Sequence, residues 1–399
     1  MNTLQERPRI AIGLMSGTSA DGVDAALVRI GSGLPPQIEV VEFLSVAYPE
    51  DLRRRVLIAC GEPGAATAEI CSLHRMAGEA FAEAALVLFE AAGLSGEQVD
   101  FIGSHGQTIR HLPEGGEGPE GALLPSTLQI GDPGIISERT GCTVVADFRA
   151  RDVAAGGSGA PLTPWAHRLL FSRPESPVAF LNLGGISNLT YIPPLEKCGL
   201  FGFDAGPANM TLDAFVEKAT GGKEHMDRDG AMAGRGHVDE SALDSLMGHP
   251  YLSLSPPKST GREMFGEAFL DAFIAPLDQR RTSTENQLAT LTAFSAECIL
   301  QAVRDHFPAE APPGEMIVGG GGIHNKTLMG RLKEGLAPIP LMSSAERGIS
   351  PDVVEAVSFA LLAWGTLRGE ATNVPAATGA ARETILGNIT PGKNYLSML

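Results

Sequence analysis

The residues with the clearest chemical potential form one stretch, 13–24, which reads Gly-Leu-Met-Ser-Gly-Thr-Ser-Ala-Asp-Gly-Val-Asp. Apolar residues alternate on both sides of it, which predicts two strands joined by a small polar hairpin tip. Such a tip offers backbone N–H groups and hydroxyls to an anion, while Asp21 and Asp24 add carboxylates that suit hydrated magnesium. Taken alone, the stretch also fits an ordinary hairpin whose polar side chains satisfy the turn.

Two later glycine-rich stretches extend this pattern. Residues 178–192 predict another hairpin with a Gly-Gly tip, and a strand at 316–318 leads into four consecutive glycines, where a base or ribose could lie against the backbone. The glycines concerned are Gly184, Gly185, Gly320 and Gly321. The chain has neither a Gly-x-x-x-x-Gly-Lys-Ser/Thr loop nor a well-placed Gly-x-Gly-x-x-Gly loop, so we expect the hairpin tips to hold polyphosphate.

Asp204 is the candidate general base. It stands in Gly-Phe-Asp-Ala-Gly-Pro-Ala-Asn, between a predicted strand and a helix expected from about Thr211. Gly206 and Pro207 predict a tight turn there. A carboxylate on such a turn could accept a proton from water or cap the following helix, and the residues alone favour the two roles equally.

Strands, helices and glycine turns alternate through two halves of the chain, each opening with a polar-tipped hairpin. Apolar spacing predicts long helices at 67–92 and 285–307, and a last one capped by residues 350–352 and ending near Arg368. Residues 113–121 are expected to form a solvated loop. The order predicts an α/β protein of two related lobes with a ligand between them.

Composition narrows the possible partners. The 399 residues suffice for two domains, and the glycine- and proline-rich run at 156–164 predicts a crossing near residue 150. A formal net charge of −17 argues against nucleic acid or an anionic membrane as partner. The five cysteines lack metal-ligand spacing, and no stretch resembles a signal peptide or a membrane span. We therefore expect a cytoplasmic protein.

The order of these features resembles the actin-like superfamily of acetate and sugar kinases and heat-shock ATPases. Within it, residues 13–24 look specifically like anhydro-N-acetylmuramic acid kinases, and further collinear motifs match that family over nearly the whole chain. These motifs lie at 103–111, 129–133, 145–162, 182–188, 202–209, 257–263 and 378–380.

The resemblance implies an α/β, two-lobed actin-like (ribonuclease H-like) sugar kinase fold with an ATP cleft between the lobes. Residues 1–150 and 366–399 would form lobe I, with the first phosphate hairpin and part of the sugar site. Residues 151–365 would form lobe II, with the second phosphate hairpin, the catalytic aspartate and the adenosine-side glycine loop. A homodimer is also implied.

The resemblance further implies an ATP-dependent reaction on 1,6-anhydro-N-acetylmuramic acid in peptidoglycan recycling. Water opens the anhydro bridge and the freed oxygen on the sixth carbon takes the γ-phosphoryl group, giving N-acetylmuramic acid 6-phosphate and ADP. Asp204 matches the catalytic aspartate of the family, and Asp21 is the expected contact for Mg²⁺. The residues implied to bind ATP are Ser16, Gly17, Thr18, Ser19, Ala20, Asp21, Gly22, Asp24, Gly184, Gly185, Gly320 and Gly321.

Four residues match positions that face the sugar in the family: His105, Thr108, Arg149 and Glu355. Arg149 also has a physical case, because the lactyl carboxylate needs a cation and an acidic protein supplies few by chance. A lone His or Glu is more often a satisfied structural residue, so both interpretations of His105 and Glu355 stay open despite the match.

Other singled-out residues favour structural roles. Asp132 is expected to cap a helix and Lys258 to anchor a loop, and the charged segment 227–230 favours a solvated turn over a metal or lid loop. Ala205, Ala208 and Ser158 depart from the family pattern, which we interpret as tuning. Because Ala208 stands where glycine is expected, either its φ is negative or the turn is slightly reshaped.

Two other functions remain open at this point. A conventional sugar kinase of the same fold would use its aspartate to deprotonate a substrate hydroxyl. A non-catalytic nucleotide-gated binding module would show no turnover. Transfer of oxygen-18 from water to the anomeric position separates the first alternative, and release of ADP separates the second.

Overall fold

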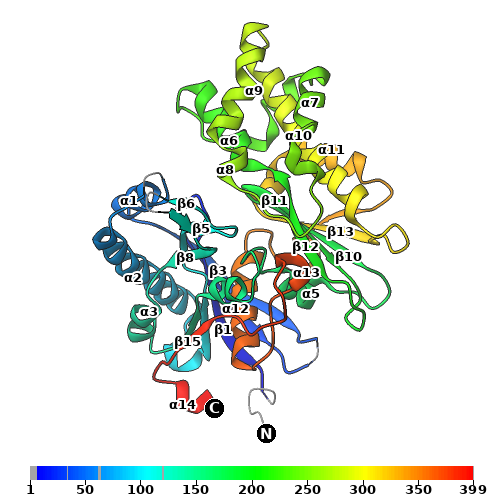
Figure 1. Cartoon of the computed structure of the whole chain (residues 1–399). Coiled ribbons are helices and arrows are strands. Elements are labelled where there is room, and N and C mark those ends of the chain that lie inside the picture. Colours follow the sequence, from blue (N-terminus) through cyan, green and yellow to red (C-terminus); the bar gives the residue numbers. More distant parts are fainter. Residues whose placement is uncertain (1–6, 34, 62–63, 119–120, 399) are drawn as a thin grey trace. The chain divides into compact units, whose positions relative to one another are not determined.

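The computed structural model describes residues 7–33, 35–61, 64–118 and 121–398. The chain divides into two compact units: unit 1 is residues 1–170 with 353–399, and unit 2 is residues 171–352 (Figure 1). Each unit is built on one main β-sheet with helices packed against it.

The main sheet of unit 1 opens with the predicted first hairpin. β1 pairs antiparallel with β2, and β2 with β3, while β4 joins β1, and β9 joins β4, in parallel. In spatial order the strands are β15 (Asn388–Thr390), β9 (Thr143–Ala146), β4 (Phe101–Ser104), β1 (Arg9–Met15), β2 (Gly22–Ile30) and β3 (Ile38–Ala47).

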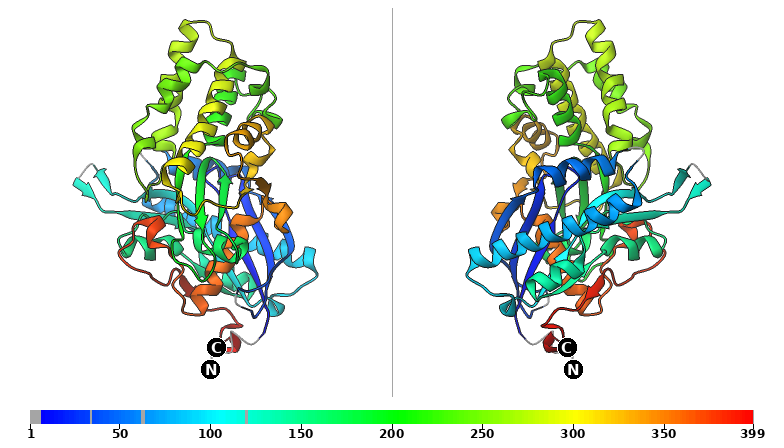
Figure 2. Two further views of the ribbon diagram at one scale, coloured as in Figure 1. Left: turned by 90° about the vertical axis from the view of Figure 1, so that its right-hand side faces the viewer. Right: turned by 90° about the vertical axis from the view of Figure 1, so that its left-hand side faces the viewer.

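Helices cover both faces of this sheet (Figure 2). Ile12 and Leu14 are buried in one core cluster with apolar residues of α2 (Thr67–Ala92). Gly13 faces the opposite side, where a Cβ would overlap the carbonyl oxygen of Ala356 in α12 (Val354–Leu367). Because successive strand residues face opposite sides, the sheet lies between α2 and α12.

The remaining helices of unit 1 are shorter. They are α1 (Glu50–Cys60), α3 (Pro133–Thr140), α4 (Phe148–Ala154), α5 (Pro164–Phe171, which ends one residue into unit 2), α13 (Pro375–Thr378) and α14 (Tyr395–Met398). Two predictions are confirmed here: α2 has the predicted bounds, and Asp132 caps α3 by accepting a hydrogen bond from the Gly134 N–H at 2.8 Å.

Two small hairpins extend from unit 1. One pairs β5 (Gln107–Leu112) with β8 (Ser126–Ile130), and the other pairs β6 (Gly116–Gly118) with β7 (Gly121–Leu123). The predicted loop at 113–121 therefore contains short, largely exposed strand segments instead, although residues 119–120 lie outside the described part.

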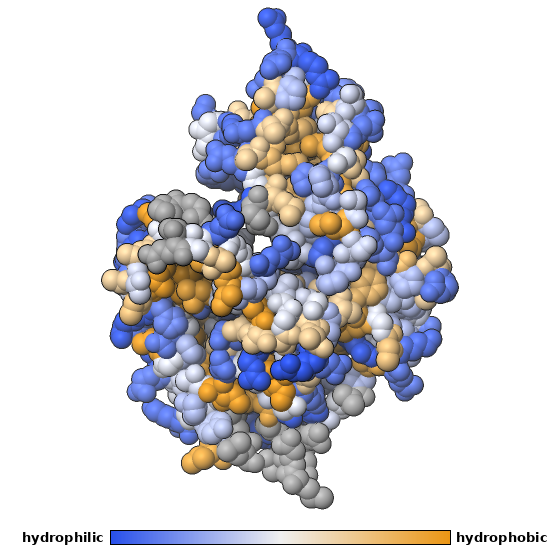
Figure 3. All heavy atoms as spheres, viewed as in Figure 1, coloured by the Kyte–Doolittle hydropathy of each residue, from blue (hydrophilic) through white to orange (hydrophobic). Residues whose placement is uncertain are grey.

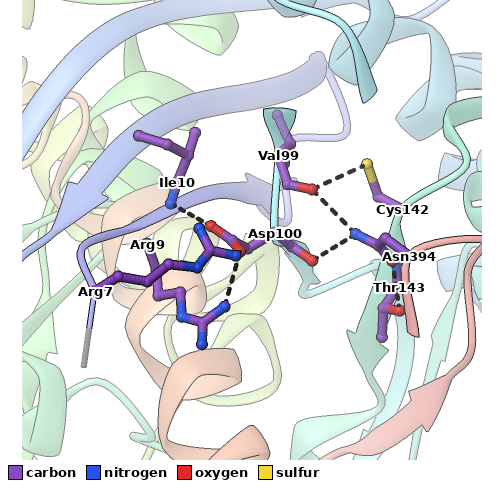
Figure 4. A network of polar contacts seen from close by, with 8 residues as sticks. All are labelled: Arg7, Arg9, Ile10, Val99, Asp100, Cys142, Thr143 and Asn394. Carbon is purple, nitrogen blue, oxygen red and sulfur yellow. Dashed lines mark hydrogen bonds and ion pairs between the residues drawn. The ribbon is translucent and has the colours of Figure 1, made fainter. Parts of the chain in front are cut away.

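The two ends of the chain are fastened to this sheet (Figure 4). The Asp100 carboxylate accepts a hydrogen bond from Arg9 Nη1 at 2.9 Å. Asn394 donates through Nδ2 to the carbonyl oxygens of Val99 and Asp100, at 3.1 and 2.7 Å. Its Oδ1 accepts from both the N–H and the hydroxyl of Thr143, each at 2.8 Å. Unit 1 is therefore complete only when the last residues of the chain are in place.

The main sheet of unit 2 repeats this arrangement. β10 and β11 form the second hairpin, β12 pairs antiparallel with β11, and β13 and then β14 add in parallel on the other side of β10. In spatial order the strands are β12 (Phe201–Pro207), β11 (Ile186–Ile192), β10 (Val178–Leu183), β13 (Glu315–Gly319) and β14 (Leu341–Ser343).

Buried apolar residues of the unit 2 sheet share a core cluster with residues of α10 and α11. The helices are α6 (Asn209–Thr220), α7 (Glu240–Met247), α8 (Arg262–Phe265), α9 (Glu267–Gln279), α10 (Thr284–His306) and α11 (Lys326–Gly335). The predicted long helix at 285–307 is confirmed as α10. The common strand order of the two sheets confirms the predicted α/β fold of two related, actin-like units.

The first unit boundary lies near residue 170, not near residue 150 as predicted. The run at 156–164, which suggested the crossing, lies within unit 1, where its glycine-rich part forms a loop. The Ser158 N–H donates to the Thr378 carbonyl oxygen at 2.7 Å, and the Gly159 N–H donates to the buried Asp152 carboxylate at 2.8 Å. Glycines there serve a tightly bonded loop and not a linker.

The second boundary lies at residue 353, not at 366. α12 was assigned to lobe II, but it packs on β1 and on β4, where a Cβ on Gly103 would overlap the Phe359 carbonyl oxygen. Its predicted cap is also wrong, because the helix begins after Val353 and has no side-chain cap. Residues 351–353 form a turn instead.

On the face shown in Figure 3, hydrophobic residues are interspersed among hydrophilic ones over both units. In the described part of the chain, no helix combines the length and the apolar character that crossing a membrane requires.

Candidate functional site

The first hairpin tip, residues 16–21, joins β1 to β2. The buried Ser16 hydroxyl lies 2.7 Å from the Gly22 carbonyl oxygen and 2.8 Å from Gln107 Oε1. Gln107 Nε2 donates to the Gly17 carbonyl oxygen at 3.1 Å. Gln107, from β5, thus fixes both the hydroxyl and the backbone at the start of the tip.

The predicted ATP-binding residues of this tip divide into two groups. Gly22 is required by the fold, because a Cβ would overlap the Val46 carbonyl oxygen. The Asp24 carboxylate accepts a hydrogen bond from the Ser45 hydroxyl of β3. In contrast, a Cβ on Gly17 would approach just one atom within 4 Å, Ser19 Oγ at 3.8 Å. The side chains that the tip exposes to solvent are those of Thr18, Ser19 and Asp21.

Ala20 is held in an unusual backbone conformation within this tip. Its φ is 50°, in the left-handed region that costs a non-glycine residue about 1 kcal/mol or more. The Ala20 N–H donates to the Gly17 carbonyl oxygen at 3.2 Å, and the Ala20 side chain is fully buried. Burial of the methyl group and this turn hydrogen bond hold the tip in one shape.

His105 and Arg149 form the polar centre of unit 1. Arg149 Nε donates to His105 Nε2 at 3.0 Å, and Arg149 Nη1 donates to the Gly159 carbonyl oxygen at 2.7 Å. His105 Nδ1 lies 2.8 Å from the Gly106 carbonyl oxygen, which requires a proton on Nδ1. Both ring nitrogens of this 4%-exposed histidine are therefore engaged within the protein.

The charges and burial around His105 favour its neutral form, with the proton on Nδ1. Burial, followed by the charge of Arg149, holds the pKa of His105 well below its ordinary value of 6.5. Burial and the same charge lower the pKa of the neighbouring His111 to about 4. Both histidines are thus neutral at pH 7, which lets the His105 Nε2 lone pair orient the guanidinium.

The other two predicted sugar residues lie nearby in the fold. His105 packs its ring against Phe359 of α12 at a centroid distance of 4.7 Å, and Glu355 is half-buried in the first turn of that helix. Thr108 lies in β5, where its hydroxyl accepts a hydrogen bond from Gln129 Nε2 at 3.2 Å. Unit 1 therefore brings His105 and Arg149 into direct contact, and Glu355 lies one turn before Phe359, the helix residue that His105 packs against.

The second hairpin tip, Gly184 and Gly185, is bonded to the start of α6. The Gly185 carbonyl oxygen accepts from the Ala208 and Met210 N–H groups at 3.0 and 3.1 Å, and the Gly184 carbonyl oxygen accepts from the Asn209 N–H at 3.1 Å. Ala208 has a φ of −131°, which confirms the negative value, one of the two expected alternatives.

The glycine loop after β13 lies beside this tip, because Gly319 pairs with Asn182 on β10. Gly320 has a φ of 81° and would clash with Asn182 Oδ1 at 2.6 Å if it carried a Cβ. Gly321 is different, since a Cβ there would meet no atom within 4 Å. Gly320 is thus needed by the fold, and Gly321 leaves open space.

Asp204 lies inside β12 and not on the predicted turn after a strand. β12 runs on to Pro207, which pairs with Ile186, and the N-cap position of α6 is taken by Ala208. Proline is tolerated here because β12 is an edge strand. The alternative role of Asp204 as a helix cap is therefore excluded.

Two donors from different elements hold the Asp204 carboxylate. Asn188 Nδ2, on β11, donates to Oδ1 at 2.9 Å, and the Thr260 N–H donates to Oδ2 at 3.0 Å. Both donors have a second polar atom, Asn188 Oδ1 and Thr260 Oγ1, that is buried and has no hydrogen-bond partner among the described residues. These atoms could serve a water or a ligand beside the carboxylate.

Sequence reasoning missed some of the residues around these centres. Asn188 and Lys258 stood in recognised motifs, but no local pattern reports their contacts to Asp204. Asn188 reaches it through the pairing of β11 with β12, and Lys258 through a backbone hydrogen bond from a loop. His111 was likewise not selected, although its Nε2 is buried without a partner among the described residues. The charged segment 227–230 is a capped turn, as expected, in which the Asp227 carboxylate accepts from the Met232 and Ala233 N–H groups.

Comparison with known proteins gives a consistent result. A family model described as anhydro-N-acetylmuramic acid kinase matches residues 9–392. An anhydro-N-acetylmuramic acid kinase of Caldanaerobacter subterraneus is 41% identical over 385 residues, covering 96% of this chain and 97% of that protein. The corresponding protein of Clostridioides difficile is 38% identical over 385 residues, covering 96% and 98%.

Among solved structures, the ROK hexokinase of Thermus thermophilus is 15% identical, with a TM-score of 0.36 over 89% of this chain and 98% of that one. The family model spans nearly the whole chain, and the curated relatives match it almost end to end. The chain therefore belongs to the anhydro-N-acetylmuramic acid kinase family of phosphotransferases.

Proposed function

We propose that this kinase uses ATP and water to convert 1,6-anhydro-N-acetylmuramic acid into N-acetylmuramic acid 6-phosphate, with Asp204 as the general base. The observation that carries the role of Asp204 is its carboxylate, fixed by two donors and flanked by two buried polar atoms without partners. A base held in this way can accept a proton without first reorienting.

The proposed reaction balances as one hydrolysis coupled to one transfer. Asp204 takes a proton from water while the water oxygen bonds to the anomeric carbon, and the bond from that carbon to the bridging oxygen breaks. The freed oxygen on the sixth carbon attacks the γ-phosphorus of ATP and ADP leaves. The proton on Asp204 then returns to solvent.

Arg149 is proposed to bind the lactyl carboxylate of the sugar. A guanidinium can spare N–H groups for a carboxylate even when others are used within the protein. His105 is proposed to act indirectly here, because both of its ring nitrogens are engaged and its lone pair orients Arg149. Thr108 and Glu355 remain proposed sugar contacts.

ATP is proposed to bind the two hairpin tips and the loop at Gly320 and Gly321. Magnesium usually binds through one or two carboxylates together with substrate phosphates. The exposed Asp21 fits this requirement, and among the described residues there is no larger cluster of metal ligands. When bound, Mg²⁺ would neutralise charge on the phosphates.

We further propose that the protein works in the cytoplasm as a homodimer. No disulfide bond joins the five cysteines, all of which lie in the described part of the chain, and this agrees with a reducing compartment. The dimer is proposed from the family resemblance.

The test is an ADP-release assay with the purified protein, ATP, Mg²⁺ and the anhydro sugar in water enriched in oxygen-18. We expect ADP release that depends on the sugar, and label at the anomeric oxygen of the product. ADP release without label would instead favour a conventional hydroxyl kinase. Binding of nucleotide and sugar without ADP release would favour a non-catalytic binding module.

A further inference from the structure

Lys258 carries a buried positive charge close to Asp204. The residue is 8% exposed, and in the part of the chain that the structure describes its ammonium forms no ion pair. Instead, Nζ lies 3.4 Å from each of the carbonyl oxygens of Tyr251 and Leu252. It also lies 4.9 Å from the ring centroid of Tyr251 and 5.7 Å from that of Phe203. Two carbonyl dipoles and two aromatic faces therefore solvate this cation.

The contacts of Lys258 lead directly to Asp204. The Lys258 carbonyl oxygen accepts a hydrogen bond from the Asp204 N–H at 3.2 Å. The Tyr251 hydroxyl donates to the Asp204 carbonyl oxygen at 2.7 Å, while the Thr260 N–H holds the Asp204 carboxylate at 3.0 Å. Phe203, under the ammonium, is the residue before Asp204. The segment 251–260 thus forms hydrogen bonds with the N–H, the carbonyl oxygen and the carboxylate of Asp204.

Burying an ammonium without a paired carboxylate is costly. Burial lowers the pKa of Lys258, and the carboxylates that oppose this effect are those of Asp305 on α10 and Asp204 on β12; the Cys298 thiol also faces it, but burial keeps that thiol neutral by raising its pKa. His306 also faces it, since burial and then the Lys258 charge lower the pKa of His306. An apolar side chain of similar length would fill the same space at less cost, so the charge itself has a use in this position.

We propose that Lys258 is a positioning residue for Asp204: its ammonium holds Tyr251 and the 258–260 segment together, so that the Tyr251 hydroxyl and the Thr260 N–H fix the base. This inference rests on the proposed role of Asp204. It goes beyond a loop anchor, because it requires that loss of the charge disturbs the chemical step more than ligand binding or folding.

The principal variant is Lys258→Met, which keeps the length of the side chain and removes the charge. We expect kcat to fall about 10-fold or more, since small displacements of a catalytic group carry costs of that order. The KM values for ATP and for the sugar should stay within about 3-fold, because Lys258 would touch neither ligand. Lys218→Met is the matched control, because Lys218 is a half-exposed partner of Asp271 in the same unit; its kcat should be unchanged.

Tyr251→Phe provides an independent test should Lys258→Met fail to fold. It removes one hydroxyl from a residue that is 2% exposed and should also lower kcat with little change in KM. If both residues act through the same segment, the Lys258→Met/Tyr251→Phe double variant should lose less than the product of the two single losses.

Asp204→Asn, assayed in parallel, distinguishes a failure of the positioning role of Lys258 from a failure of the proposed role of Asp204 as base. If Asp204→Asn is inactive while folded Lys258→Met, or Tyr251→Phe in its place, keeps kcat within about 2-fold of the unaltered protein, the positioning role is wrong and the base remains. If Asp204→Asn retains turnover, the proposed base itself is wrong. A Lys258→Met variant that raises both KM values and leaves kcat unchanged would also overturn the inference.

Discussion

Units 1 and 2 share a strand order but hold charges of opposite sign near the same end of their sheets. In unit 1, the neutral acceptors His105 Nε2 and Gly159 O orient the cation of Arg149. In unit 2, the neutral donors Asn188 Nδ2 and Thr260 N–H orient the anion of Asp204. The same order of strands can therefore orient either a cation or an anion. Hydrogen-bond acceptors surround the charged group in unit 1, and hydrogen-bond donors surround it in unit 2.

The two hairpin tips differ in a related way. The first tip exposes the side chains of Thr18, Ser19 and Asp21, whereas the second consists of Gly184 and Gly185 with their carbonyl oxygens bonded to the start of α6. The first tip therefore offers hydroxyls and a carboxylate, and the second offers backbone alone.

The largest effect is expected from Asp204→Asn, which tests whether unit 2 supplies the base. We predict that turnover falls by at least about 100-fold while ATP binding is kept, since that is the scale of losing a general base. Turnover is measured by ADP release and binding by calorimetry. Asp213→Asn, at a half-buried aspartate on α6, is the control. Near-normal turnover of folded Asp204→Asn would remove Asp204 from the mechanism.

Arg149→Met tests whether unit 1 supplies the cation. We expect the KM for the sugar to rise about 30-fold, because a charge-assisted hydrogen bond to a carboxylate would be lost. The KM for ATP should change little. Arg151→Met, at an exposed arginine of the same helix, is the matched control. Equal losses for both substrates would contradict a specific sugar contact.

Gly17→Val tests the open tip of the first hairpin. The free protein has room for a Cβ there, so a loss of ATP affinity would reflect close approach of the phosphates to this residue. We expect ATP affinity to fall about 10-fold, a loss of about 1.4 kcal/mol, with sugar affinity little changed in calorimetric titration. Gly116→Val is the control, because a Cβ at that position meets no atom within 4 Å. Unchanged ATP binding would exclude this hairpin as the phosphate loop.

Acidification should lower the stability of unit 1 more than that of unit 2. Burial, with the Arg149 charge, lowers the pKa of His111 to about 4, burial alone lowers that of His167 to about 3, and His105 shifts in the same direction. Neutral histidines of this kind contribute stability that is full above pH 6.5 and is lost as the pH falls towards their folded values. At pH 5.5 we expect a loss of about 1 kcal/mol for each.

Unit 2 contains one group of the opposite sign. Unit 2 also has His249 and His306, whose pKa values burial lowers, but both are only partly buried. Burial and then Asp227 raise the pKa of Asp213 to about 6, so acidification below that value relieves a cost that is present at pH 7. The two tryptophans, Trp165 and Trp364, lie in unit 1. Between pH 7.5 and 5.5, the unfolding midpoint from tryptophan fluorescence should therefore fall more than the midpoint from far-UV circular dichroism. Equal shifts would contradict this difference.

The sequence predicts local elements well where one residue ends them. α2 stops where Gly93 adopts a φ of 65°, and α10 begins after Ser283, whose side chain accepts from the Asn286 N–H. Both signals act within a few residues of the chain. The family motifs likewise identify Asp204 and Arg149 as candidates.

The failures concern contacts between distant residues. Gly206 and Pro207 suggested a turn, but pairing with β11 extends the strand through both. The run at 156–164 suggested a domain crossing, because its hydrogen bonds to Asp152 and Thr378 cannot be predicted from composition. The partners that fix His105 and Asp204 are also remote in sequence, so their geometry could not be predicted.

The discontinuity of unit 1 has a consequence for the order of events on the ribosome. α12, whose backbone fills the space above Gly13 and Gly103, and Asn394, which bonds to Val99 and Asp100, are synthesised after the whole of unit 2. Unit 2 can therefore fold as a continuous segment while the first 170 residues wait with one face of their sheet uncovered. Such a half-built sheet exposes apolar surface and is prone to aggregate. The newly made N-terminal half should be the part of the chain that most needs a chaperone.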